Sequence, residues 1–124
     1  NIFFENKIEY TKLASRIQKA DLLLGIFGKS NKAGNVIPNK VFQSLACGKT
    51  IITRSSDAYP KEIIKKNKGI FFVDPNNPRA LYETALKIYK NKSSLEENNN
   101  HARNIYDKYF SKETIGKQLK DILR

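Results

Sequence analysis

The sequence contains no methionine, no tryptophan, one cysteine and one histidine among its 124 residues. The single cysteine, Cys47, excludes an internal disulfide and any zinc site built from several cysteines. Because His101 is the sole imidazole, thiol and metal chemistry are poor explanations of this chain, and we expect no metal site. We interpret Cys47 as a packing residue at a helix end and His101 as a structural or surface residue.

Long apolar runs are also absent, since no stretch approaches the ~18 consecutive apolar residues that a membrane span needs. The chain is 40% hydrophobic and 28% charged, which is too apolar for a disordered tail. We therefore expect one soluble globular domain with one hydrophobic core. The missing initiator methionine and the lack of a signal-peptide pattern before the apolar run 2–4 predict a piece of a longer protein.

Negative charge is scarce relative to positive charge, with 12 Asp and Glu against 23 Lys and Arg and a formal net charge of +11. Such a balance is compatible with nucleic acid, an anionic membrane surface or a phosphorylated substrate. The lysines are scattered among abundant Asn and Ile, so we interpret most of the charge as solvated surface. A basic nucleic-acid-binding domain is our third and last hypothesis, because no aromatic and basic motif of an RNA-binding fold is present.

Strand-like segments are short and mostly unbroken by polar residues. Two continuous apolar runs, 22–27 and 70–73, have the length of strands, and a third run, 50–53, is β-branched. Unbroken runs are typical of strands covered on both faces, as in the parallel sheets of α/β proteins. With the run 2–4, the sequence predicts about four strands.

The segments between these runs have the 3.6-residue apolar spacing of amphipathic helices, as in Leu13, Ile17 and Ala20. Pro60 starts a short helix, and Pro78 opens the first of three closing helices. This order predicts a partial doubly wound, Rossmann-like parallel sheet with C-terminal helices, in which ligands bind at the carboxyl ends of the strands.

The polar segment 28–40 follows the first buried run and ends at a predicted helix start. Free backbone N–H groups of Asn39, Lys40 and Val41, the helix dipole and the Lys40 ammonium predict an anion site suited to a diphosphate. The segment matches neither the Walker loop nor the Gly-x-Gly-x-x-Gly dinucleotide fingerprint.

Three stretches of the chain together resemble a known family: residues 20–28, 37–53 and 61–75. They look like the C-terminal, donor-binding half of a GT-B glycosyltransferase of the group 1 (family 4) type. The buried strand, the sugar-binding loop and the helix with the pattern Pro-x-Lys-x-Phe-x-x-x-Ala-x-Gly-Lys follow in the family's order. The short strand, the Glu-bearing helix, the Gly-led strand and the closing helices come next in the same order.

The resemblance runs nearly end to end but covers only part of the family's fold. It implies that residues 1–124 are a partial nucleotide-sugar-binding domain. The N-terminal acceptor domain and the first two βα units, with the Arg and Lys that neutralise the leaving diphosphate in relatives, would lie outside it. We therefore expect these residues alone to be catalytically inert. In the family's strand order, 3-2-1-4-5-6, the run 2–4 would lack its neighbours and the run 22–27 would become an open edge.

The family's signature is a pair of glutamates separated by seven residues, the first on the sugar and the second on the ribose. Here the equivalent positions are Asn35 and Gln43, so both carboxylates are replaced by amides. We expect the change at Gln43 to weaken binding by about 1–2 kcal/mol. The catalytic residues stay unknown, and the resemblance implies that backbone amides from Gly34 to Ile37 hold the sugar and phosphate. The donor-binding candidates are Gly34, Asn35, Val36, Ile37, Asn39, Lys40 and Gln43.

Three further candidates have equally plausible structural roles. Arg54 and Ser55 follow a strand's carboxyl end, where phosphate could reach them, or they form a simple loop. Glu62 matches the glutamate of the family's helix after this strand, which tends to face the cleft. A surface or capping role for Glu62 is the alternative.

The resemblance implies the nucleotide-sugar-binding part of a retaining glycosyltransferase, a hexosyltransferase, in surface polysaccharide or glycolipid synthesis. The partners would be a nucleotide-diphosphate sugar, which is a substrate rather than a cofactor, and a glycan or lipid-linked acceptor bound through the missing domain. The implied location is cytoplasmic, with peripheral contact at the inner face of the membrane as an option. The alternative is a non-catalytic, degenerate nucleotide-sugar-binding module.

Overall fold

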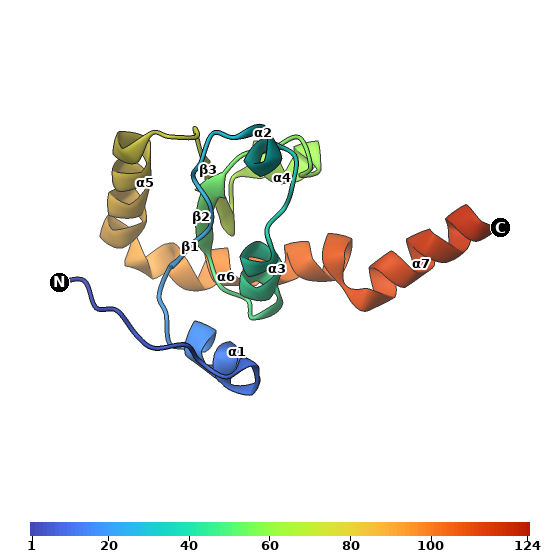
Figure 1. Ribbon diagram of the computed structural model, residues 1–124, viewed down its shortest axis with the longest axis horizontal. Coiled ribbons are helices and arrows are strands. Elements are labelled where there is room, and N and C mark those ends of the chain that lie inside the picture. The colour runs from blue at the N-terminus through green and yellow to red at the C-terminus, as the bar shows by residue number, and fades with distance from the viewer.

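Three short parallel strands form the sheet in the computed structural model, which describes residues 1–124 (Figure 1). They are β1 (Leu23–Leu24), β2 (Ile51–Arg54) and β3 (Ile70–Val73), in the order β1-β2-β3. β2 pairs in parallel with both neighbours. The predicted class, an α/β chain with a partial Rossmann-like parallel sheet, is confirmed.

Helices cover both faces of the sheet, which explains the unbroken apolar runs (Figure 1). On one face, α3 (Asn39–Ala46), α4 (Lys61–Lys66) and α6 (Leu95–Ile105) bury Val41, Leu45 and Ala102 against the sheet. On the other face, α5 (Pro78–Lys90) packs Ile88 against β2 and β3. The centre of the sheet is therefore sealed on both sides.

The predicted strand at residues 2–4 does not form, so the sheet has three strands rather than about four. Ile2, Phe3 and Phe4 are 86%, 82% and 97% exposed. A strand is stable only when a neighbouring strand satisfies its backbone groups, and this segment has no such neighbour. Residues 2–4 thus lack neighbouring strands, and β1 is an edge strand of the sheet, as the resemblance implied.

The predicted strand 22–27 is regular only over Leu23 and Leu24, although its backbone pairing with β2 continues further. Gly25 N–H donates to the carbonyl of Ile52 at 2.7 Å, and Arg54 N–H donates to that of Ile26 at 2.9 Å. A Cβ built on Gly25 would lie 2.3 Å from Oγ1 of Thr53, so only glycine allows this approach. The chain therefore leaves the sheet just before the polar segment that follows.

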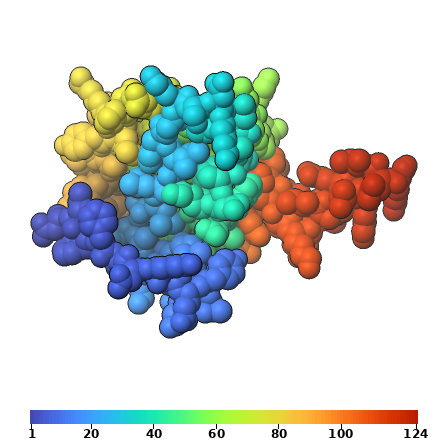
Figure 2. Space-filling view, in the orientation of Figure 1, coloured from blue at the N-terminus to red at the C-terminus, as the bar shows by residue number.

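The remaining helices lie at the periphery. α1 (Tyr10–Gln18) buries no residue, and α2 (Asn31–Gly34) is a single turn inside the predicted polar segment. After the short turn η1 (Lys92–Ser94), α6 runs into the π-helical turn η2 (Tyr106–Phe110), and α7 (Lys112–Leu123) extends away from the body (Figures 1 and 2). None of the helices combines the length and apolar character that crossing a bilayer requires.

Candidate functional site

A shallow pocket of about 360 Å³ lies where β1 and β2 end. The segment after β1, the end of α2 and the segment after β2 enclose it. Four of the predicted site residues meet there: Gly34, Asn35, Arg54 and Ser55. This is the carboxyl edge of the sheet, where open α/β folds bind their ligands.

Arg54 is the most firmly held cation of this pocket. Its Nη1 donates to the carbonyl of Gly28 at 2.6 Å, and its Nε donates to its neighbour Ser55's carbonyl at 3.0 Å. It forms no ion pair with any carboxylate. The guanidinium therefore keeps its full positive charge available to a ligand.

The backbone amides from Gly34 to Ile37, predicted to hold sugar and phosphate, divide into two groups. Gly34 N–H donates to the backbone carbonyl of Ser30 at 3.1 Å, and Asn35 N–H donates to that of Lys32 at 3.2 Å. Both amides are therefore used within the turn of α2. The N–H groups of Val36 and Ile37 make no hydrogen bond within the chain. The side chain of Ile37 packs against the core, and neither Val36 nor Ile37 lines the pocket.

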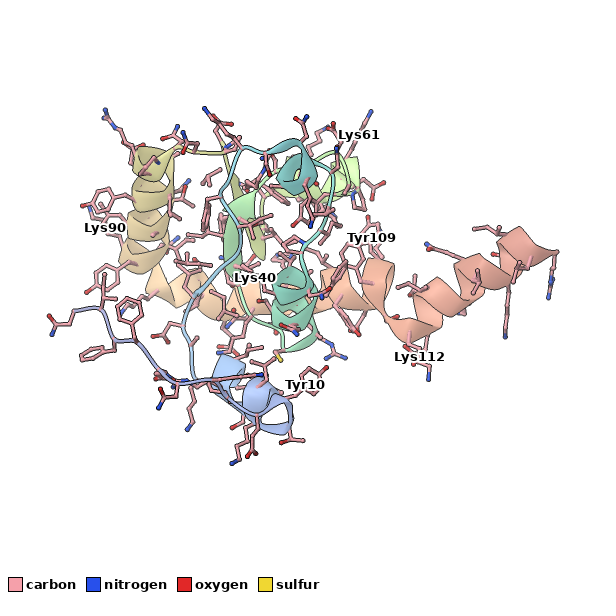
Figure 3. All side chains as sticks on the ribbon, in the orientation of Figure 1. Tyr10, Lys40, Lys61, Lys90, Tyr109 and Lys112 are labelled. Carbon is pink, nitrogen blue, oxygen red and sulfur yellow. The ribbon has the colours of Figure 1, made fainter.

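The start of α3 has two free amides rather than the predicted three. Val41 N–H donates to the carbonyl of Pro38 at 2.9 Å, because the first turn of the helix is tight. Asn39 and Lys40 N–H have no acceptor in the chain. Lys40, labelled on α3 in Figure 3, forms no ion pair. Neither residue lines the pocket that contains Arg54.

The predicted amide pair is not brought together. Asn35 lines the pocket at the carboxyl edge, whereas Gln43 lines a separate, mostly apolar hollow of about 210 Å³ between α1 and α3. Leu13 and Ile17 of α1 form part of its wall. In this structure, a ligand that fills one hollow does not touch both amides.

Glu62 faces the C-terminal helices rather than the pocket. Tyr109 donates a hydrogen bond to its Oε2, and Lys108 Nζ lies 3.6 Å from the same atom. The hydrogen bond from Tyr109, followed by the charge of Lys108, lowers the pKa of Glu62 below its usual value. This contact connects η2 to α4 and agrees with the surface role considered above for Glu62.

Cys47 and His101 lie outside the pocket. Cys47 is the C-cap of α3, and its carbonyl accepts a hydrogen bond from Nε2 of Gln18 at 2.7 Å. His101 Nε2 lies 3.5 Å from Oε1 of Glu97, one helical turn away. Both positions agree with the structural interpretation of these residues.

Six residues of the pocket were not predicted. Most of them could have been found from their position, because they follow the two strands whose carboxyl ends form the pocket. What the sequence did not reveal is that α2 forms there and folds over the edge. These residues are Lys29, Ser30, Asn31, Ser56, Asp57 and Ile64.

One comparison with known proteins found a similar sequence. Over 121 residues the chain is 22% identical to an uncharacterized glycosyltransferase of Methanocaldococcus jannaschii. The match includes 98% of this chain, which spans only 30% of the relative's length. No protein-family model matches the chain, and no solved structure matches it. The similarity supports a glycosyltransferase-like chain.

Proposed function

We propose that this chain is the nucleotide-sugar-binding part of a retaining glycosyltransferase of the GT-B fold. Its substrate would be a nucleotide-diphosphate sugar, and the complete enzyme would act in surface polysaccharide or glycolipid synthesis. The glycan or lipid-linked acceptor would bind to a domain outside these residues. The distant similarity to a glycosyltransferase along 98% of the chain supports this proposal.

The observation that carries the proposal is the pocket at the carboxyl edge of the sheet. In this pocket, Gly34 and Asn35 of the loop implied by the resemblance lie beside Arg54, a cation without a carboxylate partner. Sugar transfer makes the diphosphate the leaving group, so negative charge develops there in the transition state. Fixed cations and N–H groups stabilise such charge without reorganising.

A calorimetric titration tests this function in the complete protein. We expect UDP-sugars or GDP-sugars to bind more tightly than the corresponding nucleoside monophosphates, and salt to weaken the binding. Lys40→Ala should also weaken it, because the ammonium lies at the start of α3. Equal affinity of Lys40→Ala and the parent protein for UDP and GDP would make Lys40 a surface lysine. Absence of any preference for the diphosphates would contradict the proposed function.

A second candidate, a non-catalytic nucleotide-sugar-binding module, is favoured by the amides at Asn35 and Gln43. Their separation into two hollows also differs from a site that holds one donor between both residues. A transfer assay with the complete protein distinguishes the two candidates. An enzyme would release nucleoside diphosphate in the presence of acceptor, whereas the module would bind the donor without turnover.

A further inference from the structure

The guanidinium of Arg54 is held in one orientation by two different loops. The Gly28 carbonyl belongs to the segment after β1, and the Ser55 carbonyl belongs to the segment after β2. A guanidinium has five N–H groups, and these two bonds leave Nη2 with none of its N–H groups used. The side chain is therefore oriented before any ligand arrives, and it retains free donors.

Gly34 leaves the Nη2 side of this guanidinium unobstructed. A Cβ built on Gly34 would lie 3.2 Å from Nη2 and 3.8 Å from Cζ of Arg54. A larger side chain would therefore occupy the space in front of the free N–H groups. The absence of a side chain at this position and the free donors of Arg54 are two features of the same pocket.

The other charges of the pocket also favour an anion. Lys29 and Arg54 contribute two positive charges, and Asp57 contributes the one carboxylate. Two of the hydroxyls already have partners, because Ser30 Oγ accepts from Ala33 N–H and Ser56 Oγ donates to the Val36 carbonyl. The free N–H groups of Arg54 are thus the best-oriented donors that a ligand would meet.

We propose that Arg54 binds a phosphate group of the donor's diphosphate through Nη2, and that Gly34 is the position that keeps this approach open. The inference rests on the proposed function and adds a binding residue to it. Arginine matches phosphate oxygens with parallel N–H groups, which gives direction as well as charge. The chain itself would then supply a cation to the leaving group, in addition to any that lie elsewhere in the enzyme.

The test uses inorganic pyrophosphate as the probe, titrated into the full chain by calorimetry. We expect Arg54→Gln to weaken pyrophosphate binding at least tenfold, equivalent to about 1.4 kcal/mol. The affinity of Arg54→Lys should lie between those of the parent protein and Arg54→Gln. The control is Arg79→Gln on α5, an arginine that is 88% exposed and should leave the affinity unchanged. Arg54→Gln should also reduce the salt dependence of binding, which a mere connection between loops would not affect.

Gly34→Ala tests the same inference with Arg54 in place, and it remains informative if Arg54→Gln does not fold. We expect pyrophosphate binding to weaken severalfold, because the new Cβ displaces the guanidinium. Gly116→Ala on α7 is the matched control, since nothing lies within 4 Å of its added Cβ. Thermal unfolding without ligand separately measures the contribution of Arg54 to loop stability.

Equal affinity for pyrophosphate in the parent, Arg54→Gln and Gly34→Ala would overturn the inference. The proposed function can fail separately. Pyrophosphate binding that needs Arg54, with no gain from a nucleoside or sugar, would keep the phosphate site and contradict the nucleotide-sugar function. Nucleotide-sugar binding that does not change in the Arg54 and Gly34 variants would support the proposed function and contradict the phosphate site at Arg54. If neither pyrophosphate nor the nucleotide-sugar binds, both the function and the site are overturned.

Discussion

The two neighbours of β2, the strands β3 and β1, differ sharply in how much of their apolar run forms regular sheet. Toward β3, pairing extends from Ile51 opposite Ile70 to Arg54 opposite Val73, and both isoleucines are 0% exposed. Toward β1, regular strand pairing includes only Leu23 and Leu24, although backbone hydrogen bonds continue to Ile26, and Leu24 is 52% exposed. Both β1 and β3 are edge strands of the sheet, but α4 and α5 pack against β3, whereas Leu24 of β1 remains half exposed. Similar sequence runs thus have different outcomes because helices cover β3 more completely than β1.

The largest expected effect lies at the centre of the covered side. Ile51→Ala should lower the free energy of unfolding by about 2–5 kcal/mol, because it leaves a cavity in the core. Leu24→Ala on the open side should cost at most about 1 kcal/mol, since its side chain is half exposed. Urea unfolding of both variants measures this difference, and equal losses would show that β1 is as well packed as β2.

A pH titration sharpens the same comparison at Tyr59, which is 3% exposed and packs edge-on against Phe72 of β3 with ring centroids 4.9 Å apart. Burial raises the pKa of the Tyr59 phenol from 10.0 to about 12, and the neighbouring Thr53 side chain lowers this pKa by less. By geometry the buried hydroxyl has no hydrogen-bond partner. Because the folded state favours the protonated phenol, its contribution is complete below pH 10 and is lost as pH rises toward 12. We expect a loss of about 2–3 kcal/mol across that window.

Tyr59→Phe is the control for this titration. It should remove the loss between pH 10 and pH 12 and leave stability at neutral pH unchanged or slightly higher, because it deletes an unpaired buried hydroxyl. Denaturant unfolding measured at several pH values gives both results. An unchanged pH dependence in the variant would assign the loss to other groups.

On the β1 side, Gln43→Glu tests whether the hollow at α1 and the pocket at Asn35 act together. The resemblance predicts that the carboxylate tightens nucleotide-sugar binding in the complete protein by up to about tenfold, or ~1.4 kcal/mol, through a charge-assisted ribose contact. Calorimetry with the same donor measures the change. Unchanged or weaker affinity would indicate that the two hollows are independent, as their separation in the structure suggests.

The smallest effect is expected at the contact between α4 and η2. Tyr109→Phe should raise the pKa of Glu62, because it removes the hydrogen bond that contributes most to lowering it. In the parent chain, the lowered pKa contributes stability at pH values above the unfolded pKa, and this is lost as pH falls. An NMR titration of the Glu62 carboxyl measures the shift. Tyr82→Phe, at a side chain 65% exposed on α5, should leave it unchanged.

The candidate site could be predicted in part, and the failures have physical causes. The rule that ligands bind at strand ends pointed to Arg54 and Ser55, and the resemblance pointed to Gly34 and Asn35. All four line one pocket, and their role as a donor site stays a prediction. The rule could not anticipate the turn of α2, whose four residues carry little helical pattern and are set by the Ser30 cap. It also could not tell which face of α3 would carry Gln43.

The sequence by itself determined the elements whose signal is local. The β-branched run predicted at 50–53 and the apolar run predicted at 70–73 form β2 and β3. Pro60 is the N-cap of α4 and Pro78 opens α5, because side-chain shape and backbone restrictions act within a few residues. Only the tertiary structure decided the outcomes that depend on a neighbour. Residues 2–4 are as apolar as a strand but stay exposed, since a strand needs a partner that the local sequence does not supply.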